Sequence, residues 1–244
     1  MRTLKMETIA AVCPRCGNRI NLSPTAFLCL EHLSGTDWHV DLERLFRMYC
    51  PKCLMLFEHQ QDMTLQSARH GFRIRLIADI DAESNDRRRR RIVDAQSGLL
   101  EHAPDDPLRD LIFLRRIVTS AEALREKAHI LSMRLCDKRA ELLKYAVWRN
   151  HGSANEYAIL RFLRHDERIA VRLQCAQGAW IFYCGEQILE WLGRRIWTHE
   201  SEVIDMNWAR KNFRHFCRDP ILRMEVDKLF GRFFVPAAGM RKRH

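Results

Sequence analysis

The sequence has no long hydrophobic run. Its longest uninterrupted apolar stretches cover only a few residues, as at 179–184, whereas a helix that crosses a bilayer needs roughly 20. Near the start, Lys5 and Glu7 interrupt the apolar residues, so residues 1–12 do not form the core of a secretory signal. We therefore expect a protein that has no membrane association and stays in the cytoplasm.

Motifs that mark common enzyme classes are also missing. The chain has no glycine-rich phosphate loop, no Gly-x-Ser-x-Gly elbow and no His-Glu-x-x-His zinc motif. An enzyme would need a site assembled from distant residues, and we consider His129 and Cys136, which would share one face of a predicted helix. Because a cysteine on an apolar stripe usually belongs to a core, an enzyme is the least favoured interpretation.

Positive charge is abundant, with 41 Lys and Arg against 31 Asp and Glu, a net charge of +10. This excess suggests a nucleic-acid partner. The densest block is the arginine run at residues 87–91, and its acidic neighbours are Asp79, Asp81, Glu83, Asp86 and Asp94. The block is therefore nearly neutral locally, which favours a solvated linker or helix surface over an arm that contacts phosphates.

The nine cysteines are the most informative residues present. In a reducing cytoplasm they are better interpreted as metal ligands or buried small side chains than as disulfides. Two sulfurs separated by two residues on a tight turn can bind one ion, and two such turns supply the four thiolates of a tetrahedral zinc site. Two Cys-Pro-x-Cys motifs therefore predict one structural Zn²⁺ bound by Cys13, Cys16, Cys50 and Cys53.

The segment between the motifs, residues 17–49, is longer than the roughly 15 to 20 residues of a compact zinc ribbon. Apolar residues recur near helical spacing between residues 38 and 48, which predicts a short helix inserted in the ribbon. Gly17 follows the first motif and can adopt the positive φ that turns backbone N–H groups toward the sulfurs. Leu54 stands at the equivalent position without that freedom, so we expect the second turn to be strained or slightly different.

Two rival interpretations of the cysteines stay open. A rubredoxin-like iron centre uses the same Cys-Pro-x-Cys-Gly pattern, and a reactive dithiol uses one Cys-x-x-Cys pair. Structural zinc is favoured because two pairs occur here without a βαβ pattern, and four sulfurs leave the ion no open position for a substrate. Within the insert, Cys29, His32 and His39 are interpreted as a buried thiol and two surface imidazoles, not as a second metal site.

The rest of the chain predicts an α+β fold in which helices and a strand meander share a core. Residues 81–106 are rich in charge and in chain-breaking residues, which predicts an exposed linker between domains at 1–80 and 107–244. A Thr119-x-x-Glu122 pattern then predicts a helix from about residue 120 that carries apolar residues as far as Leu135.

A second helix is expected to start at Asp137 and to end near Gly152. Residues 169–175 alternate between apolar and polar, which predicts a half-buried strand with antiparallel neighbours at 157–163 and 180–183. Short helices are expected at 186–192 and 205–216. The predicted architecture is thus an N-terminal zinc ribbon with an inserted helix, followed by a helical segment and a small antiparallel sheet.

The doubled cysteine motif resembles that of the CpXC-domain proteins of bacteria. The similarity extends to Phe-Arg-Ile-Arg-Leu at residues 72–76, to the helical segments within 114–144 and to Met-Asn-Trp-Ala at 206–209. Two positions depart from the pattern, since the family commonly has glycine where Leu54 stands and differs at residues 68–70. The resemblance implies a four-cysteine metal-binding domain with an appended α+β region, and it implies no particular activity.

We interpret the chain as a zinc-binding protein that acts as a regulatory or scaffolding module and binds a protein partner through its C-terminal domain. The C-terminal aromatic residues form a core or a partner surface, with a core favoured; they are Trp180, Trp191, Trp197, Trp208 and Phe213. The first alternative is a nucleic-acid binder that uses the zinc ribbon and the arginine-rich surface. The second is an enzyme with an unrecognised active site.

Overall fold

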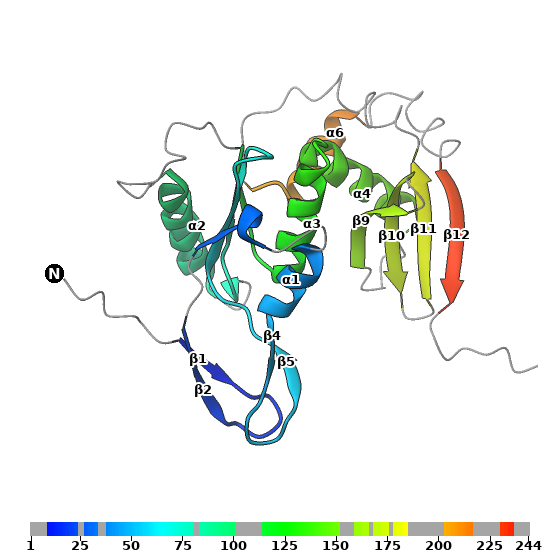
Figure 1. The fold of residues 1–244 in the computed structure, drawn as a ribbon. Coiled ribbons are helices and arrows are strands. Elements are labelled where there is room, and N and C mark those ends of the chain that lie inside the picture. Colours follow the sequence, from blue (N-terminus) through cyan, green and yellow to red (C-terminus); the bar gives the residue numbers. More distant parts are fainter. Residues whose placement is uncertain are drawn as a thin grey trace, which may run out of the picture. The chain divides into compact units, whose positions relative to one another are not determined.

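The computed structural model describes ten segments of the chain, residues 9–23, 27–33, 38–80, 83–100, 114–151, 159–165, 168–175, 178–184, 203–216 and 230–236. The chain divides into two compact units, residues 1–129 and 130–244. Helices and small, mostly antiparallel sheets occur in both, which confirms the predicted α+β class (Figure 1). No helix within the ten segments is long and apolar enough to span a membrane.

The first unit begins with two antiparallel β-hairpins, which we call the thiolate lobe. β1 (Ile9–Val12) pairs with β2 (Arg19–Leu22), and β4 (Arg47–Tyr49) pairs with β5 (Leu56–Glu58). Helix α1 (Trp38–Leu45) leads into β4, so the predicted inserted helix is confirmed. Figure 1 shows the two hairpins side by side, extending away from the rest of the first unit.

A four-stranded mixed sheet forms the centre of the first unit. Its strands, in spatial order, are β3 (Phe27–Cys29), β6 (Met63–Ser67), β7 (Phe72–Leu76) and β8 (Leu114–Val118). The two central strands are antiparallel, whereas each outer strand runs parallel to its neighbour. Along β7, Phe72, Ile74 and Leu76 are fully buried, and the arginines between them lie on the opposite face of the sheet.

Helix α2 (Asn85–Leu100) lies within the segment that the sequence predicted as an exposed linker. The helix packs against β7 and β8, and its Ala95 and Leu99 are buried. Arg73 of β7 donates from Nη1 to the carbonyl of Leu99 at 3.3 Å. This part of the charged segment therefore covers one face of the sheet, because two apolar residues four apart lie on a single side of the helix. The domain ranges 1–80, 81–106 and 107–244 stay predictions.

Arg91, the last residue of the arginine run, anchors α2 to the rest of the first unit. Its guanidinium donates to the carbonyl of Ala78 at 2.9 Å, to Glu83 at 2.8 Å and to Asp62 at 2.6 Å. Asp62 also accepts the N–H of Ala78 at 2.8 Å. The arginine run was expected to be solvated, but Arg91 stabilises the first unit through these hydrogen bonds.

Helix α3 (Ala121–Ser132) begins where the sequence predicted, but with a different cap. Ser120 Oγ accepts the N–H of Ala123 at 3.1 Å, which makes Ser120 the capping residue instead of Thr119. The apolar positions of the helix are buried as expected, with Leu124 and Ala128 both fully removed from solvent.

The end of α3 corrects the sequence interpretation of His129 and Cys136. Arg134 has φ of 58°, and the N–H of Leu135 donates back to the carbonyl of Ile130 at 3.1 Å, as in a Schellman termination. Cys136 therefore lies beyond the helix, and the expectation that it shares a helix face with His129 is wrong. The left-handed conformation of Arg134, two positions before Cys136, was not visible in the apolar spacing.

The second unit is a four-stranded antiparallel sheet that packs against helices. Its strands, in spatial order, are β12 (Phe230–Pro236), β11 (Gly178–Cys184), β10 (Arg168–Cys175) and β9 (Ile159–His165). Helix α4 (Asp137–His151) contacts β9 and β10, and α6 (Met206–Phe216) contacts α4. The three predicted strands are confirmed, β12 was not predicted, and the helix expected at 186–192 lies outside the described residues.

One face of this second sheet carries the hydrophobic core of its unit. Val171 of β10 lies directly opposite Phe162 of β9 and Phe182 of β11, and all three are buried. Trp180 and Trp208 are partly buried and pack against this cluster, so these two aromatic residues belong to a core. The described residues do not include Trp191, Trp197 or the side chain of Phe213.

Candidate metal centre

Two short loops with the same backbone pattern present the cysteines, and we call them the first knuckle (residues 13–18) and the second knuckle (residues 50–55). In the first, the N–H of Cys13 donates to the carbonyl of Asn18, and the N–H of Gly17 donates to the carbonyl of Cys13, both at 2.9 Å. The second repeats both bonds at 2.9 Å, from Cys50 to Met55 and from Leu54 to Cys50. Each hairpin therefore holds its two cysteines on a closed turn.

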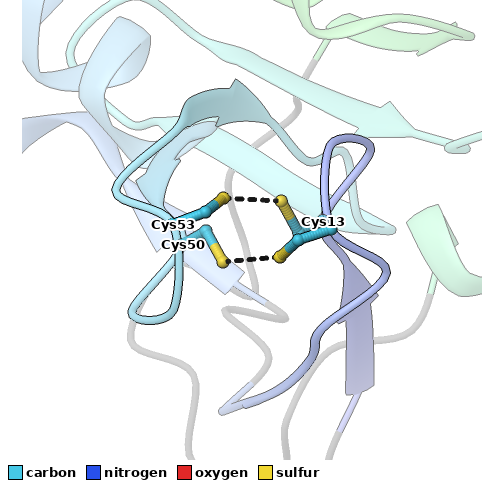
Figure 2. A group of neighbouring side chains, drawn as sticks. Cys13, Cys50 and Cys53 are labelled. Carbon is cyan, nitrogen blue, oxygen red and sulfur yellow. Dashed lines mark hydrogen bonds between the residues drawn. The ribbon is translucent and has the colours of Figure 1, made fainter.

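The four sulfurs that the sequence singled out come together between the two knuckles. Their Sγ atoms all lie within 4.8 Å of one another, and the cross-knuckle distances from Cys13 to Cys53 and from Cys16 to Cys50 are both 3.6 Å. Figure 2 shows the two knuckles facing each other across this gap. A disulfide has sulfurs about 2.05 Å apart. Four sulfurs bound tetrahedrally at about 2.3 Å from one zinc ion lie about 3.8 Å apart.

The electrostatics of the knuckles favour thiolates at some of these positions and oppose them at others. Desolvation raises the pKa of Cys50, but the backbone N–H groups of Cys53 and Lys52, together with the thiols of Cys16 and Cys53, outweigh it and lower that pKa to about 6. At Cys53 the N–H of Met55 lowers the pKa, yet desolvation and the other three thiols raise it to about 12. A fourth negative charge is thus costly at this site unless a cation accompanies it.

Leu54 adopts a left-handed backbone conformation, which glycine adopts more easily than any other residue. Its φ is 58°, close to the 67° of Gly17 at the equivalent position of the first knuckle. The second knuckle is therefore strained, as expected, but its hydrogen bonds are not different. A Cβ atom built at Gly17 would meet no atom within 4 Å, so there is room for a side chain. Glycine is favoured at this position because it adopts the positive φ without strain.

We expect Leu54→Gly to stabilise the protein. A non-glycine residue in the left-handed region costs roughly 1 to 2 kcal/mol, and the greater freedom of glycine in the unfolded chain offsets part of that gain. The free energy of unfolding should rise by about 0.5 to 1 kcal/mol, measured by urea denaturation of the metal-loaded chain. The matched variant Gly17→Ala should lower it, and a loss of stability in Leu54→Gly would contradict the strain.

Cys29 and His32 of the insert do not join the four knuckle cysteines. Among the described residues, the four knuckle cysteines are the only group placed to hold a metal ion. The Cys29 thiol instead donates to Glu31 at 3.0 Å, and His32 is exposed. The backbone of residue 39 lies in α1, and its side chain is outside the description.

Glu31 organises a second polar site in the first unit, which sequence reasoning missed because its partners are distant in the chain. Its carboxylate accepts the Ser67 hydroxyl at 2.7 Å and the N–H of Arg69 at 2.9 Å, besides the Cys29 thiol. Desolvation raises the pKa of Glu31, but these three donors outweigh it and lower the pKa to about 2 from 4.5. The carboxylate ties η1 (Leu30–His32) to the turn after β6.

The lowered pKa predicts that Glu31 stays ionised at pH 4.5, where an ordinary glutamate is half protonated. Because the folded pKa is depressed, its contribution to stability is fully present above pH 4.5 and is lost as the pH falls toward about 2. The side-chain carboxyl chemical shift of Glu31, followed by NMR from pH 7 to pH 4, should stay constant. A Glu31 midpoint near 4.5 would contradict the prediction.

The fold and this centre define a class, an α+β protein with a four-cysteine site that could hold a metal ion. The family model described as CpXC protein matches residues 11–144, just over half of the chain. The chain therefore belongs to the CpXC family, which confirms the resemblance seen in the sequence. Comparison with curated proteins and with solved structures gives no significant match.

Proposed function

We propose that the four knuckle cysteines bind one structural Zn²⁺ ion and that the protein is a binding module, not an enzyme. The observation that carries this proposal is the convergence of four sulfurs, with no carboxylate or imidazole among them, within 4.8 Å. An all-sulfur donor set suits zinc or an iron–sulfur site and is a poor match for magnesium or calcium. Zinc is favoured over iron because it requires no redox chemistry and prefers tetrahedral sites.

A zinc ion with four thiolate ligands has no vacant position at which to activate water or a substrate. Its contribution is to the folding free energy, because it links two hairpins that are too small to be stable alone. The backbone N–H groups of Arg15 and Cys16 in the first knuckle, and of Lys52 and Cys53 in the second, hydrogen-bond to sulfur and offset the negative charge. These features support a structural role for the ion.

The proposed partner is a protein. The sequence favoured the C-terminal domain as the part of the chain that binds it. The test uses the full chain, tagged and recovered from its native cells, with zinc either retained or removed by a chelator. The proposal expects a protein that co-purifies at a fixed ratio to the chain and is lost when zinc is removed. Recovery of the chain without any protein in stoichiometric amount would contradict the binding role.

Nucleic acid is the second candidate partner, and one observation favours it. Arg87, Arg89 and Arg90 of α2 are exposed, although Arg87 lies 3.6 Å from Glu83 and Arg91 is held in ion pairs. If these cations contact phosphates, affinity for DNA or RNA should fall steeply as salt rises from about 50 to 200 mM. Electrophoretic shifts with both nucleic acids at these two salt concentrations provide the test, and no binding at the lower concentration would exclude this candidate.

A further inference from the structure

The thiolate lobe exposes four large apolar side chains, and we call them the knuckle surface. They are Val12, Tyr49, Leu54 and Leu56, with exposed fractions of 54%, 67%, 76% and 44%. Three of them are adjacent in sequence to a knuckle cysteine, so they lie on the two hairpins that bring the four sulfurs together. Tyr49 and Leu56 also lie directly opposite each other in the β4–β5 pairing.

The strand pairing explains why these side chains face solvent. Within β1 and β4, Ala11 is buried and Met48 is half-buried, while the residues that follow them, Val12 and Tyr49, alternate to the outer face. In a small domain, an outward strand position next to a turn is usually polar. Apolar residues at both equivalent positions therefore make a surface suited to contact with another molecule.

Leu54 provides an independent observation that points to the same surface. It occupies a left-handed backbone conformation with φ of 58°, where glycine would be free of strain, as Gly17 is in the first knuckle. Its side chain is the most exposed of the four, so it contributes little to the packing of the free chain. A residue that is costly to the fold and unused inside it is expected where a binding surface needs its side chain.

Three exposed cations lie on the same two hairpins as the knuckle surface. Arg15 and Lys52 lie at the tips of the two knuckles, and Arg19 lies opposite Val12 in the β1–β2 pairing; all three are exposed. None of the three forms an ion pair within the described part of the chain. The surface thus combines apolar anchors with positive charge, which is complementary to a segment that carries apolar residues between acidic ones.

We propose that the knuckle surface binds an acidic segment of a partner protein whose aliphatic or aromatic side chains pack on Leu54, Val12 and Tyr49. This inference rests on the proposed binding role and gives it a partner chemistry and a surface in the first unit, in place of the C-terminal domain that the sequence favoured. Three of the four apolar side chains are aliphatic, whereas single-stranded nucleic acid is bound by stacking bases on aromatic rings. A second copy of this chain is disfavoured, because the chain carries a net charge of +10 and repels itself.

The test selects ligands from a random library of 16-residue peptides displayed on phage, using the full zinc-loaded chain as bait. Selected peptides are synthesised, and their affinity is measured by fluorescence anisotropy for the wild type, Leu54→Gly, Lys52→Glu and Val93→Ala. Val93 is the matched control, since it is an exposed apolar residue on α2 with an exposed fraction of 57%. Leu54→Gly removes the most exposed of the four side chains and is expected to stabilise the fold, so weaker binding is not explained by unfolding.

The expected peptides carry Asp or Glu on both sides of apolar residues. Their affinity should fall at least tenfold in Leu54→Gly and in Lys52→Glu, and it should not change in Val93→Ala. The inference is overturned if no peptide is selected or if the selected peptides are basic or uncharged. It is also overturned if their affinity is unchanged in Leu54→Gly. If Leu54→Gly weakens binding of a dT20 oligonucleotide, the surface binds single-stranded nucleic acid instead. If the wild type sediments as a dimer and Leu54→Gly does not, the surface binds a second copy of the chain instead.

The failure of this inference is distinguishable from the failure of the proposed function. If a protein co-purifies with the chain from native cells and still does so with Leu54→Gly, the binding role stands and the knuckle surface is wrong. If no protein co-purifies and no peptide is selected, both are wrong.

Discussion

Replacing Cys50 with serine is expected to abolish metal binding and to unfold the thiolate lobe. A serine hydroxyl is a poor zinc ligand, and removal of one ligand opens the site to water. Structural zinc contributes an apparent folding free energy of roughly 10 to 16 kcal/mol in small zinc-finger peptides, so little of the lobe should persist without it. Metal analysis should show about one zinc per wild-type chain and less than a tenth of that in Cys50→Ser.

The matched control for this substitution is Cys136→Ser. Cys136 is exposed and lies beyond the end of α3, so its loss should leave metal content and the lobe unchanged. Amide NMR signals of β1, β2, β4 and β5 should collapse in Cys50→Ser alone, while those of the second unit should keep their dispersion. An equal metal content in the two variants would show that the knuckles are not the metal site.

Phe182→Ala should destabilise the second unit by about 3 to 5 kcal/mol. Phe182 is 1% exposed and lies in one cross-strand row with Val171 and Phe162, so truncation removes buried area and leaves a cavity in the core. Thermal or urea unfolding of the zinc-loaded chain, followed by a signal from the second unit, measures the loss.

Gln174→Ala is the control for that experiment. Gln174 belongs to the same sheet but is exposed, and alternation along β10 places it on the face opposite Val171. Its truncation should change the free energy of unfolding by less than about 0.5 kcal/mol. Similar losses in the two variants would contradict the strand register, because a shift of one residue exchanges the two faces.

The four cysteines that could hold a metal ion were recognisable in the sequence because each pair is local. Each Cys-Pro-x-Cys pair sits on one tight turn, so the ligand geometry within a pair is set by adjacent residues. The relative placement of the two pairs was less certain, since residues 17–49 separate them. In the structure, two hairpins with the same hydrogen-bond pattern bring the two cysteine pairs together.

The central sheet of the first unit was not predicted, for a physical reason. Its outer pairs are parallel and join β3 to β6 and β7 to β8, strands that are far apart in the chain. Local periodicity does not reveal such pairings, although the alternation of Phe72, Ile74 and Leu76 with arginines was a usable signal. In the second unit the strands β9, β10 and β11 pair as sequential neighbours, and there the alternation was sufficient.

The charged segment makes contacts within the first unit that its composition did not indicate. The run and its acidic neighbours suggested an exposed connection, yet Ala95 and Leu99 follow four apart and are buried. Arg91 is recruited by Asp62 and Glu83, and only the folded chain brings all three together. Tertiary ion pairs of this kind carry no mark in the sequence.

Zinc K-edge X-ray absorption of the purified, reduced chain tests the central claim most directly. The account predicts about one zinc per chain, with four sulfur neighbours at about 2.3 Å and no nitrogen or oxygen in the first shell. A first shell containing nitrogen or oxygen donors, or a chain that holds iron or no metal under reducing conditions, would contradict it.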